Sequence, residues 1–177
     1  MCIRDRFNPK HLRLRADIPL WHKENLVNIA AQKILPHDWK AFAWIDADIE
    51  FESPTWVDDT LRLLNGSQDI VQLWSQCDDM NKSQQTMKIF QSFAYQYHKG
   101  RNYETSGVNL WHPGYAWAIT RQAYEKIGGL YDLSILGSGD HNMAMALVGN
   151  MSLNPLTSDG YRTVSYTHLT LPTKRIV

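Results

Sequence analysis

The sequence predicts an α/β fold with a mostly parallel sheet and flanking helices, and three observations lead to this fold class. First, the apolar run Ala41–Ile45 ends in the acidic pair Asp46 and Asp48, as a buried strand would. Second, the segments around it alternate in the order strand, helix, strand, helix, strand, which is typical of parallel strands joined by crossover helices. Third, the credible part of the chain, residues 7–163, suits about one domain or part of a larger one.

Both ends of the chain match translated sequencing adapters rather than a gene product. Met1–Asp5 corresponds to the transposon end used in sequencing libraries, and residues 164–173 correspond to its reverse complement. We therefore expect residues 1–6 and 164–177 to be artefactual tails, which are set aside in reasoning about the fold. Residues 7–163 then form a partial domain that is incomplete at both ends.

Periodicity predicts the first elements of this domain. Alternation over His11–Ala16 indicates a half-exposed strand. Apolar residues at helical spacing predict a helix over Asn25–Leu35, and Pro36 stops it. The buried strand follows over Lys40–Asp46. Together these segments form the first strand–helix–strand unit.

The next elements follow from capping residues and composition. Ser53 is a candidate N-cap for a helix that runs to Leu64, and 69–74 is another apolar strand. Residues 75–110 lose the pattern and are rich in polar side chains, so we expect a long surface loop there.

Order returns after this loop. Thr120 is expected to cap a short helix that ends at Ile127, where Gly128 and its neighbour close it. A last helix is predicted over 141–148, with Asp140 as its N-cap.

Composition argues against several classes of function. The chain has 18 basic and 18 acidic residues, and without the tails its net charge moves from 0 to −3. The absence of a run of Lys or Arg argues against nucleic-acid binding. Only Cys77 remains in 7–163, so no internal disulfide can form and a cytoplasmic location is expected. No stretch approaches the roughly 18 apolar residues of a membrane span.

The acidic pair is the first candidate site. Because side chains alternate along a strand, Asp46 and Asp48 emerge on one side of the chain at the carboxyl end of the predicted strand. Open α/β sheets bind ligands at these strand ends. Two carboxylates there can hold a divalent cation, and the cation can hold a diphosphate.

Three motifs resemble GT-A-fold glycosyltransferases, over roughly 21–149. The helix that begins Lys23-Glu24-Asn25 resembles one that these enzymes carry before their acidic strand. Trp44–Asp48 matches their DxD motif. The segments 112–118, 128–132 and 137–141 resemble the C-terminal block of family 2-like and galactosyltransferase-like members.

The resemblance implies a fold and a reaction. The fold would be GT-A, a Rossmann-like α/β domain. The reaction would be metal-dependent transfer of a sugar from a nucleotide-sugar donor, a UDP-sugar by preference, to a glycan or other hydroxyl acceptor with inversion. Asp46, Asp48 and His141 would be the ligands of Mn²⁺ or Mg²⁺, and Asp140 would be the catalytic base. The acid that precedes this base in the family is replaced here by Gly139.

Five further residues are candidates for donor or acceptor binding. Trp111, His112 and Gly114 could line the gap between metal and base, with the Trp111 ring stacked on a sugar face. Gly137 and Gly139 would let the backbone approach a ligand closely.

Each candidate also has a structural interpretation. Asp46 and Asp48 could belong to a capped turn, Asp140 could be a helix N-cap, and His112 and His141 could be structural histidines.

Two other classes of protein stay open. Haloacid-dehalogenase-like phosphatases also carry two Asp one residue apart after a strand, but they need Thr or a small residue where this chain has Glu50. A non-catalytic carbohydrate-binding protein would suit the seven Trp, although such modules are usually all-β.

Overall fold

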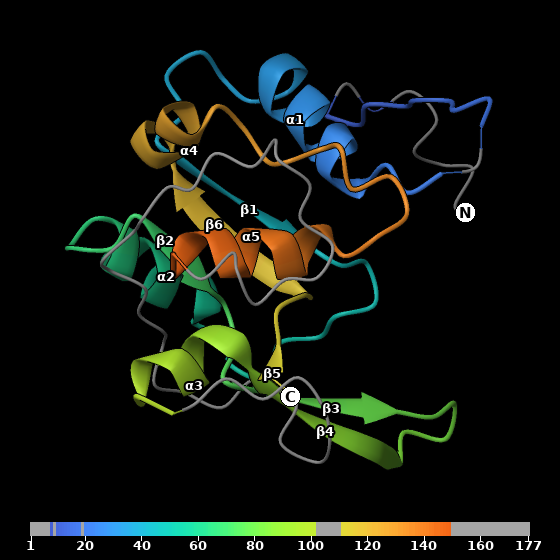
Figure 1. Ribbon diagram of the computed structural model, residues 1–177, viewed down its shortest axis with the longest axis vertical. Helices are drawn as coiled ribbons and strands as arrows, with labels where there is room; N and C mark the ends of the chain where they lie inside the picture. The colour runs from blue at the N-terminus through green and yellow to red at the C-terminus, as the bar shows by residue number, and fades with distance from the viewer. Residues whose placement is uncertain (1–7, 9, 19, 102–110, 150–177) are drawn as a thin grey trace.

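The computed structural model describes residues 8, 10–18, 20–101 and 111–149. The expected tails, 1–6 and 164–177, lie outside these residues. Figure 1 shows a small central sheet with helices on both faces, and a two-stranded hairpin that extends away from it. None of the helices in the described ranges is long and apolar enough to cross a membrane.

The central sheet consists of β1 (Ala41–Ile45), β2 (Ile70–Gln72) and β6 (Ala116–Thr120) in the order β1-β6-β2. β6 is antiparallel to both neighbours. The prediction of a mostly parallel, Rossmann-like GT-A sheet is therefore wrong. β1 and β2 do run in the same direction, but β6 lies between them, so the parallel pair expected from the strand–helix–strand order does not form.

The burial of β6 explains its central place. Trp117 and Ile119 point to one face of the sheet, and Ala116 and Ala118 point to the other; all four are at most 1% exposed. A strand that is apolar on both faces is best buried between two others. β1 is only partly buried and lies at the edge of the described sheet.

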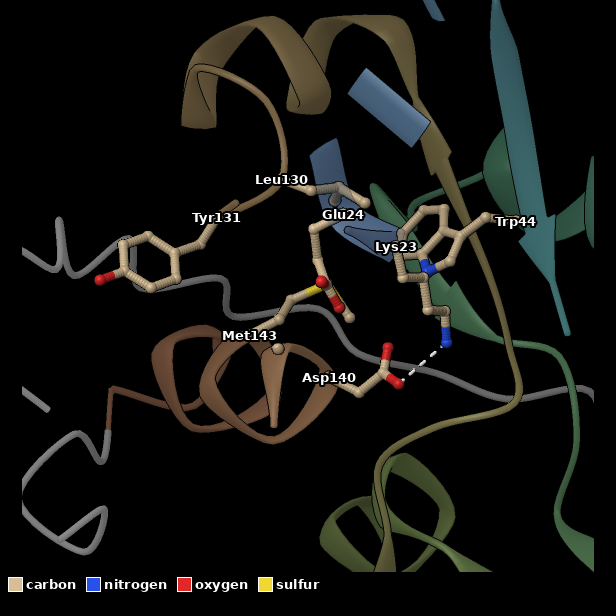
Figure 2. A pocket seen from close by; sticks show the side chains of 8 residues that line it. Lys23, Glu24, Trp44, Leu130, Tyr131, Asp140 and Met143 are labelled. Carbon is tan, nitrogen blue, oxygen red and sulfur yellow. Dashed lines mark hydrogen bonds and ion pairs between the residues drawn. The ribbon is translucent and has the colours of Figure 1, made fainter. Parts of the chain in front are cut away.

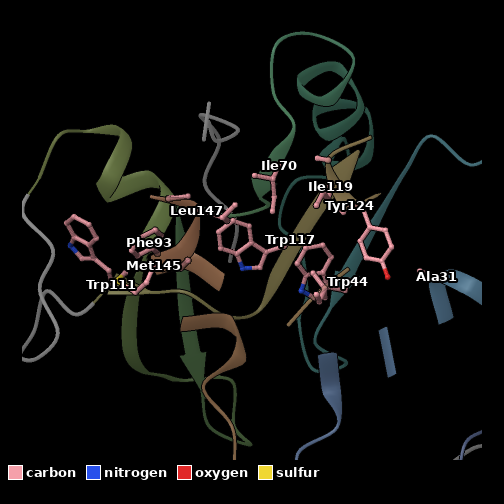
Figure 3. Close-up of a cluster of buried hydrophobic side chains, with 14 residues drawn as sticks. Ala31, Trp44, Ile70, Phe93, Trp111, Trp117, Ile119, Tyr124, Met145 and Leu147 are labelled. Atoms are coloured by element: carbon pink, nitrogen blue, oxygen red, sulfur yellow. The ribbon is translucent and has the colours of Figure 1, made fainter. Parts of the chain in front are cut away.

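Helices cover both faces of this sheet. On one face Trp117 and Ile70 pack in a hydrophobic cluster with Met145 of α5 (Gly139–Leu147), as Figure 3 shows. On the other face Val71 belongs to a second cluster with Leu64 of α2 (Trp56–Leu64). The sheet is thus the middle layer of three.

One asparagine joins α1 (Lys23–Lys33) to the turn that follows α4 (Arg121–Ile127). The Asn28 side chain donates to the Leu130 carbonyl at 2.8 Å and accepts from the Leu130 N–H at 2.9 Å. The Tyr124 hydroxyl also donates to it at 2.9 Å. These bonds fix the position of α1 against the segment that leads into α5.

The region predicted as a long loop contains β3 (Gln76–Met80), β4 (Thr86–Ser92) and α3 (Phe93–His98), and β5 (Trp111–His112) follows it. These strands form a second, mixed sheet in the order β3-β4-β5. Asn81 holds the hairpin turn, since its side-chain oxygen accepts from Ser83 N at 2.9 Å and Gln85 N at 3.0 Å. The loop prediction is wrong because many of the polar residues belong to a projecting hairpin (Figure 1). Its part over 102–110 lies outside the described residues.

Several local predictions are confirmed and others need correction. Thr120 caps α4 and Gly128 ends it at φ +76°, as expected. No strand forms in the described residues of 11–16. The N-cap of α2 is Thr55 rather than Ser53. Ser138, not Asp140, is the N-cap of α5, so Asp140 lies inside the first helical turn.

Candidate active site

Lys23 brings together two acids that the sequence places far apart. Its Nζ lies 2.7 Å from Asp46 Oδ1 and 3.0 Å from Asp140 Oδ2. Asp46 follows the end of β1, Asp140 lies in the first turn of α5, and Lys23 begins α1. Figure 2 shows the Lys23 side chain reaching Asp140. A predicted metal ligand and the predicted base therefore share one cation.

Burial and the ion pairs set the charge states in this cluster. Burial opposes the charge of Lys23, but Asp140 and Asp46 outweigh it, so the pKa of Lys23 is raised. Burial also raises the pKa of Asp140, against the lowering influence of Lys23. A carboxylate with a raised pKa is a stronger base than an exposed one. The arrangement thus favours proton acceptance by Asp140.

His112 and Gly114 form the wall beside Asp140. Gln72, which is fully buried, donates to the carbonyls of His112 and Gly114, both at 3.0 Å. A Cβ at position 114 would lie 2.8 Å from His112 Cε1 and 3.2 Å from Asp140 Oδ2. Glycine is therefore required for this close approach. Burial lowers the pKa of His112 to about 4, so its ring is neutral near pH 7.

Asp48 lines a second cavity, of about 110 Å³, whose lining also includes Trp74 and Tyr115. The Tyr115 ring stacks on His112 with centroids 4.0 Å apart, and its backbone has a φ of +79°. The Asp46 N–H donates to the Tyr115 carbonyl at 2.8 Å. Tyr115 thus connects Asp46, which pairs with Lys23, to the cavity that Asp48 lines.

Two predicted site residues, His141 and Trp111, do not join this cluster. Within the described ranges no three His, Cys, Asp or Glu side chains are arranged to hold a metal, so His141 does not complete a ligand set with Asp46 and Asp48. Trp111 belongs to the hydrophobic cluster, with 3% exposed, and its ring packs edge-on against Phe93 (Figure 3). It is therefore not available to stack on a sugar.

The two glycines ahead of Asp140 have different surroundings. Gly137 has a φ of +103° in the loop before α5, and a Cβ there would meet no described atom within 4 Å. A Cβ at Gly139, by contrast, would overlap the carboxylate of Glu24. Gly139 is therefore the glycine that permits a close approach, and the group that it admits is a side chain of the protein.

Three residues of the site were not among the predicted ones: Lys23, Glu24 and Tyr115. The sequence carried a signal for the first two, since Lys23 and Glu24 begin the helix that resembles the family motif. Tyr115 follows a Pro-Gly turn, but its positive φ has no signature in the sequence.

No family model, no curated protein and no solved structure matches this chain. The function is therefore argued from the site alone.

Proposed function

We propose that this protein transfers a sugar from a nucleotide-sugar donor to a hydroxyl acceptor, with the help of a divalent cation. The observation that supports it best is the meeting of Asp46 and Asp140 at Lys23 Nζ, at 2.7 and 3.0 Å. This reaction needs an acid that holds a cation and an acid that accepts a proton close to each other. Asp46 would serve as the first and Asp140 as the second.

The acids at the end of β1 fit a cation that is shared with a substrate. Asp46 and Asp48 would hold it, and the oxygens of a diphosphate would complete its coordination, as is usual for Mg²⁺ in phosphate-containing sites. Bound there, the cation would stabilise the negative charge of the departing diphosphate.

The described side chains supply the rest of the chemistry. Asp140 accepts the proton of the acceptor hydroxyl as the new glycosidic bond forms. Lys23 holds the Asp140 carboxylate in place and favours its ionised form. Gly114 leaves room beside Asp140, because a side chain there would press on the carboxylate.

The cavity beside Asp48 suits part of a nucleotide sugar. It is lined by Tyr115, which is partly exposed, and by three acids, Asp48, Glu50 and Asp78. Trp74, at 2% exposed, belongs to the buried cluster beneath it. Aromatic faces pack against sugar and base rings, while carboxylates accept hydrogen bonds from hydroxyls.

Calorimetric titration with UDP and Mn²⁺ tests the proposal. Wild-type protein should bind UDP only when Mn²⁺ is present, and Asp48→Ala should weaken this binding at least about tenfold. Asp58→Ala, which removes an exposed acid of α2, is the matched control and should bind as wild type does. Unchanged binding by Asp48→Ala would overturn the proposal. Release of phosphate from an aryl phosphate ester would favour a phosphatase instead.

A further inference from the structure

Glu24 is a buried acid with an unmatched oxygen. Its side chain lies in the first turn of α1 and the residue is only 7% exposed. Its Oε1 has no hydrogen-bond partner in the part of the chain that the structure describes. Buried polar atoms are nearly always hydrogen-bonded in folded proteins, so this exception points to a missing partner.

The fold keeps space for this carboxylate. A Cβ at position 139 would overlap the Glu24 side chain, so Gly139 is what allows α5 to begin against it. Figure 2 shows Glu24 reaching from α1 toward α5, on the same side as Asp140. Because Gly139 has no side chain, the Glu24 carboxylate has room beside the start of α5.

A small cavity adjoins Glu24. Its lining includes Lys23, Glu24, Gly139 and Asp140. Its volume of about 10 Å³ admits one water-sized group. A single hydroxyl fits such a space, but a whole sugar ring does not.

The chemistry of the cavity identifies the missing partner as a donor. An ionised carboxylate can only accept hydrogen bonds. Lys23 is the one cationic side chain among the lining residues, and it already contacts Asp46 and Asp140. An O–H group of a bound molecule is a donor of the size that this cavity admits.

We propose that Glu24 Oε1 accepts a hydrogen bond from one hydroxyl of the acceptor and thereby presents a neighbouring hydroxyl to Asp140. This inference rests on the proposed function and adds the substrate class: an acceptor with adjacent hydroxyl groups, as in a sugar ring. Glu24 is then a binding residue for the acceptor, not for the nucleotide-sugar donor.

The thermal midpoint of the free protein gives the first test. Glu24→Gln replaces a buried carboxylate by a neutral group of the same shape, and Glu52→Gln makes the same change at an exposed position. A carboxylate kept for a ligand contributes nothing to folding, so the midpoint of Glu24→Gln should equal or exceed that of wild type. A midpoint lower by about 2–4 °C or more would assign Glu24 to the fold and overturn the inference.

Steady-state kinetics give the second test. UDP-glucose and UDP-galactose serve as donors, and methyl β-glucoside and methyl β-galactoside as acceptors with adjacent hydroxyls. Because the bond to a charged oxygen becomes a weaker bond to a neutral amide oxygen, Glu24→Gln should raise the acceptor KM about 5- to 10-fold and leave the donor KM unchanged. An unchanged acceptor KM, or a raised donor KM, would contradict the inference. If neither methyl glycoside stimulates UDP release by wild type, the thermal midpoint decides alone.

The variant Gly139→Ala tests the position of the Glu24 carboxylate separately from its charge. The new methyl group meets the flexible end of Glu24, so the carboxylate should move out of the cavity while its charge remains. The acceptor KM should rise as it does in Glu24→Gln; a KM equal to that of wild type would count against the inference.

If wild type fails to bind UDP with Mn²⁺, the proposed function fails. If it binds and Glu24→Gln keeps the wild-type acceptor KM, only the role of Glu24 fails.

Discussion

Two clusters lie next to each other in this protein. One is the hydrophobic cluster around Trp117, and the other is the polar cluster of Lys23, Glu24, Asp46 and Asp140. Trp44 contributes to both. They differ in how completely their polar groups are matched. Trp117 is fully buried and its indole N–H donates to the Pro113 carbonyl at 2.6 Å. In the polar cluster Glu24 Oε1 has no partner among the described residues. The comparison teaches that the two clusters can be told apart by their polar atoms: the indole N–H of Trp117 has its acceptor, whereas Glu24 Oε1 is buried without a described donor.

The largest effect should follow from opening the hydrophobic cluster. Trp117→Ala removes a side chain that is 0% exposed and leaves a cavity between the sheet and α5. Such truncations cost about 3–5 kcal/mol in the free energy of unfolding. Urea unfolding measures this loss. A loss below about 1 kcal/mol would mean that the cluster is not the stabilising core, and would break the comparison.

In the polar cluster, substitution of Asp140 should lower the rate of turnover rather than the stability. Asp140→Asn keeps the shape of the proposed base but removes its ability to accept a proton. Loss of general-base catalysis should lower kcat by about 10²- to 10⁴-fold, while the thermal midpoint stays near that of wild type. Sugar transfer from UDP-glucose or UDP-galactose is the measurement, with the exposed Asp132→Asn as control. Wild-type kcat in Asp140→Asn would remove the base from the mechanism.

The two clusters should also respond differently to pH. His112 has a pKa of about 4 in the folded protein, against 6.5 ordinarily, because it is buried. As pH falls from 6.5 toward 4, the unfolded chain takes up a proton that the folded one does not, so the free energy of unfolding decreases. His112→Asn keeps an acceptor for the Gly114 N–H but does not titrate.

The wild type should therefore lose about 2 kcal/mol more than His112→Asn between pH 7 and pH 4.5. Urea unfolding at both pH values measures the difference. The exposed His37→Asn is the control and should lose stability as wild type does. Parallel losses in wild type and His112→Asn would show that burial of this ring does not control the acid response.

The smallest expected effect on stability comes from the N-cap of α4, which lies outside the polar cluster. The Thr120 hydroxyl accepts from Ala123 N at 3.2 Å and caps α4. Thr120→Ala should lower the free energy of unfolding by about 1 kcal/mol, without an effect on UDP binding, and Thr120→Ser should restore most of it. Equal stability in Thr120→Ala and wild type would mean that the cap is dispensable.

Local features of the fold could be predicted from the sequence. Three of these features depend on residues close together in the chain: the strand that ends just before Asp46, the Thr120 cap and the Gly128 stop. The order of the strands could not, because the pairing of β6 with β1 and β2 joins distant segments. Alternation of strands and helices favours adjacent parallel strands, and nothing local showed that β6 would lie between them.

The candidate site was predictable in part. Asp46 and Asp140 were chosen from motifs, and the structure brings both to Lys23. Glu24 lies in the helix that resembles the family motif, but its burial could not be predicted, since an acid in the first turn of a helix is ordinarily exposed and favoured by the helix dipole. Its burial depends on the approach of α5 at Gly139, which is a tertiary contact.

The position of β6 between β1 and β2 also determines when the protein can fold. β6 comes later in the chain than β1 and β2, so the middle strand of the sheet is synthesised after both of its neighbours. Until residues 116–120 leave the ribosome, β1 and β2 lack the partner that joins them. Closing so long a loop costs entropy, and sheets built from distant strands fold slowly. During synthesis the nascent chain therefore exposes the apolar segment 41–45, and binding of this segment by a chaperone would protect it until β6 arrives.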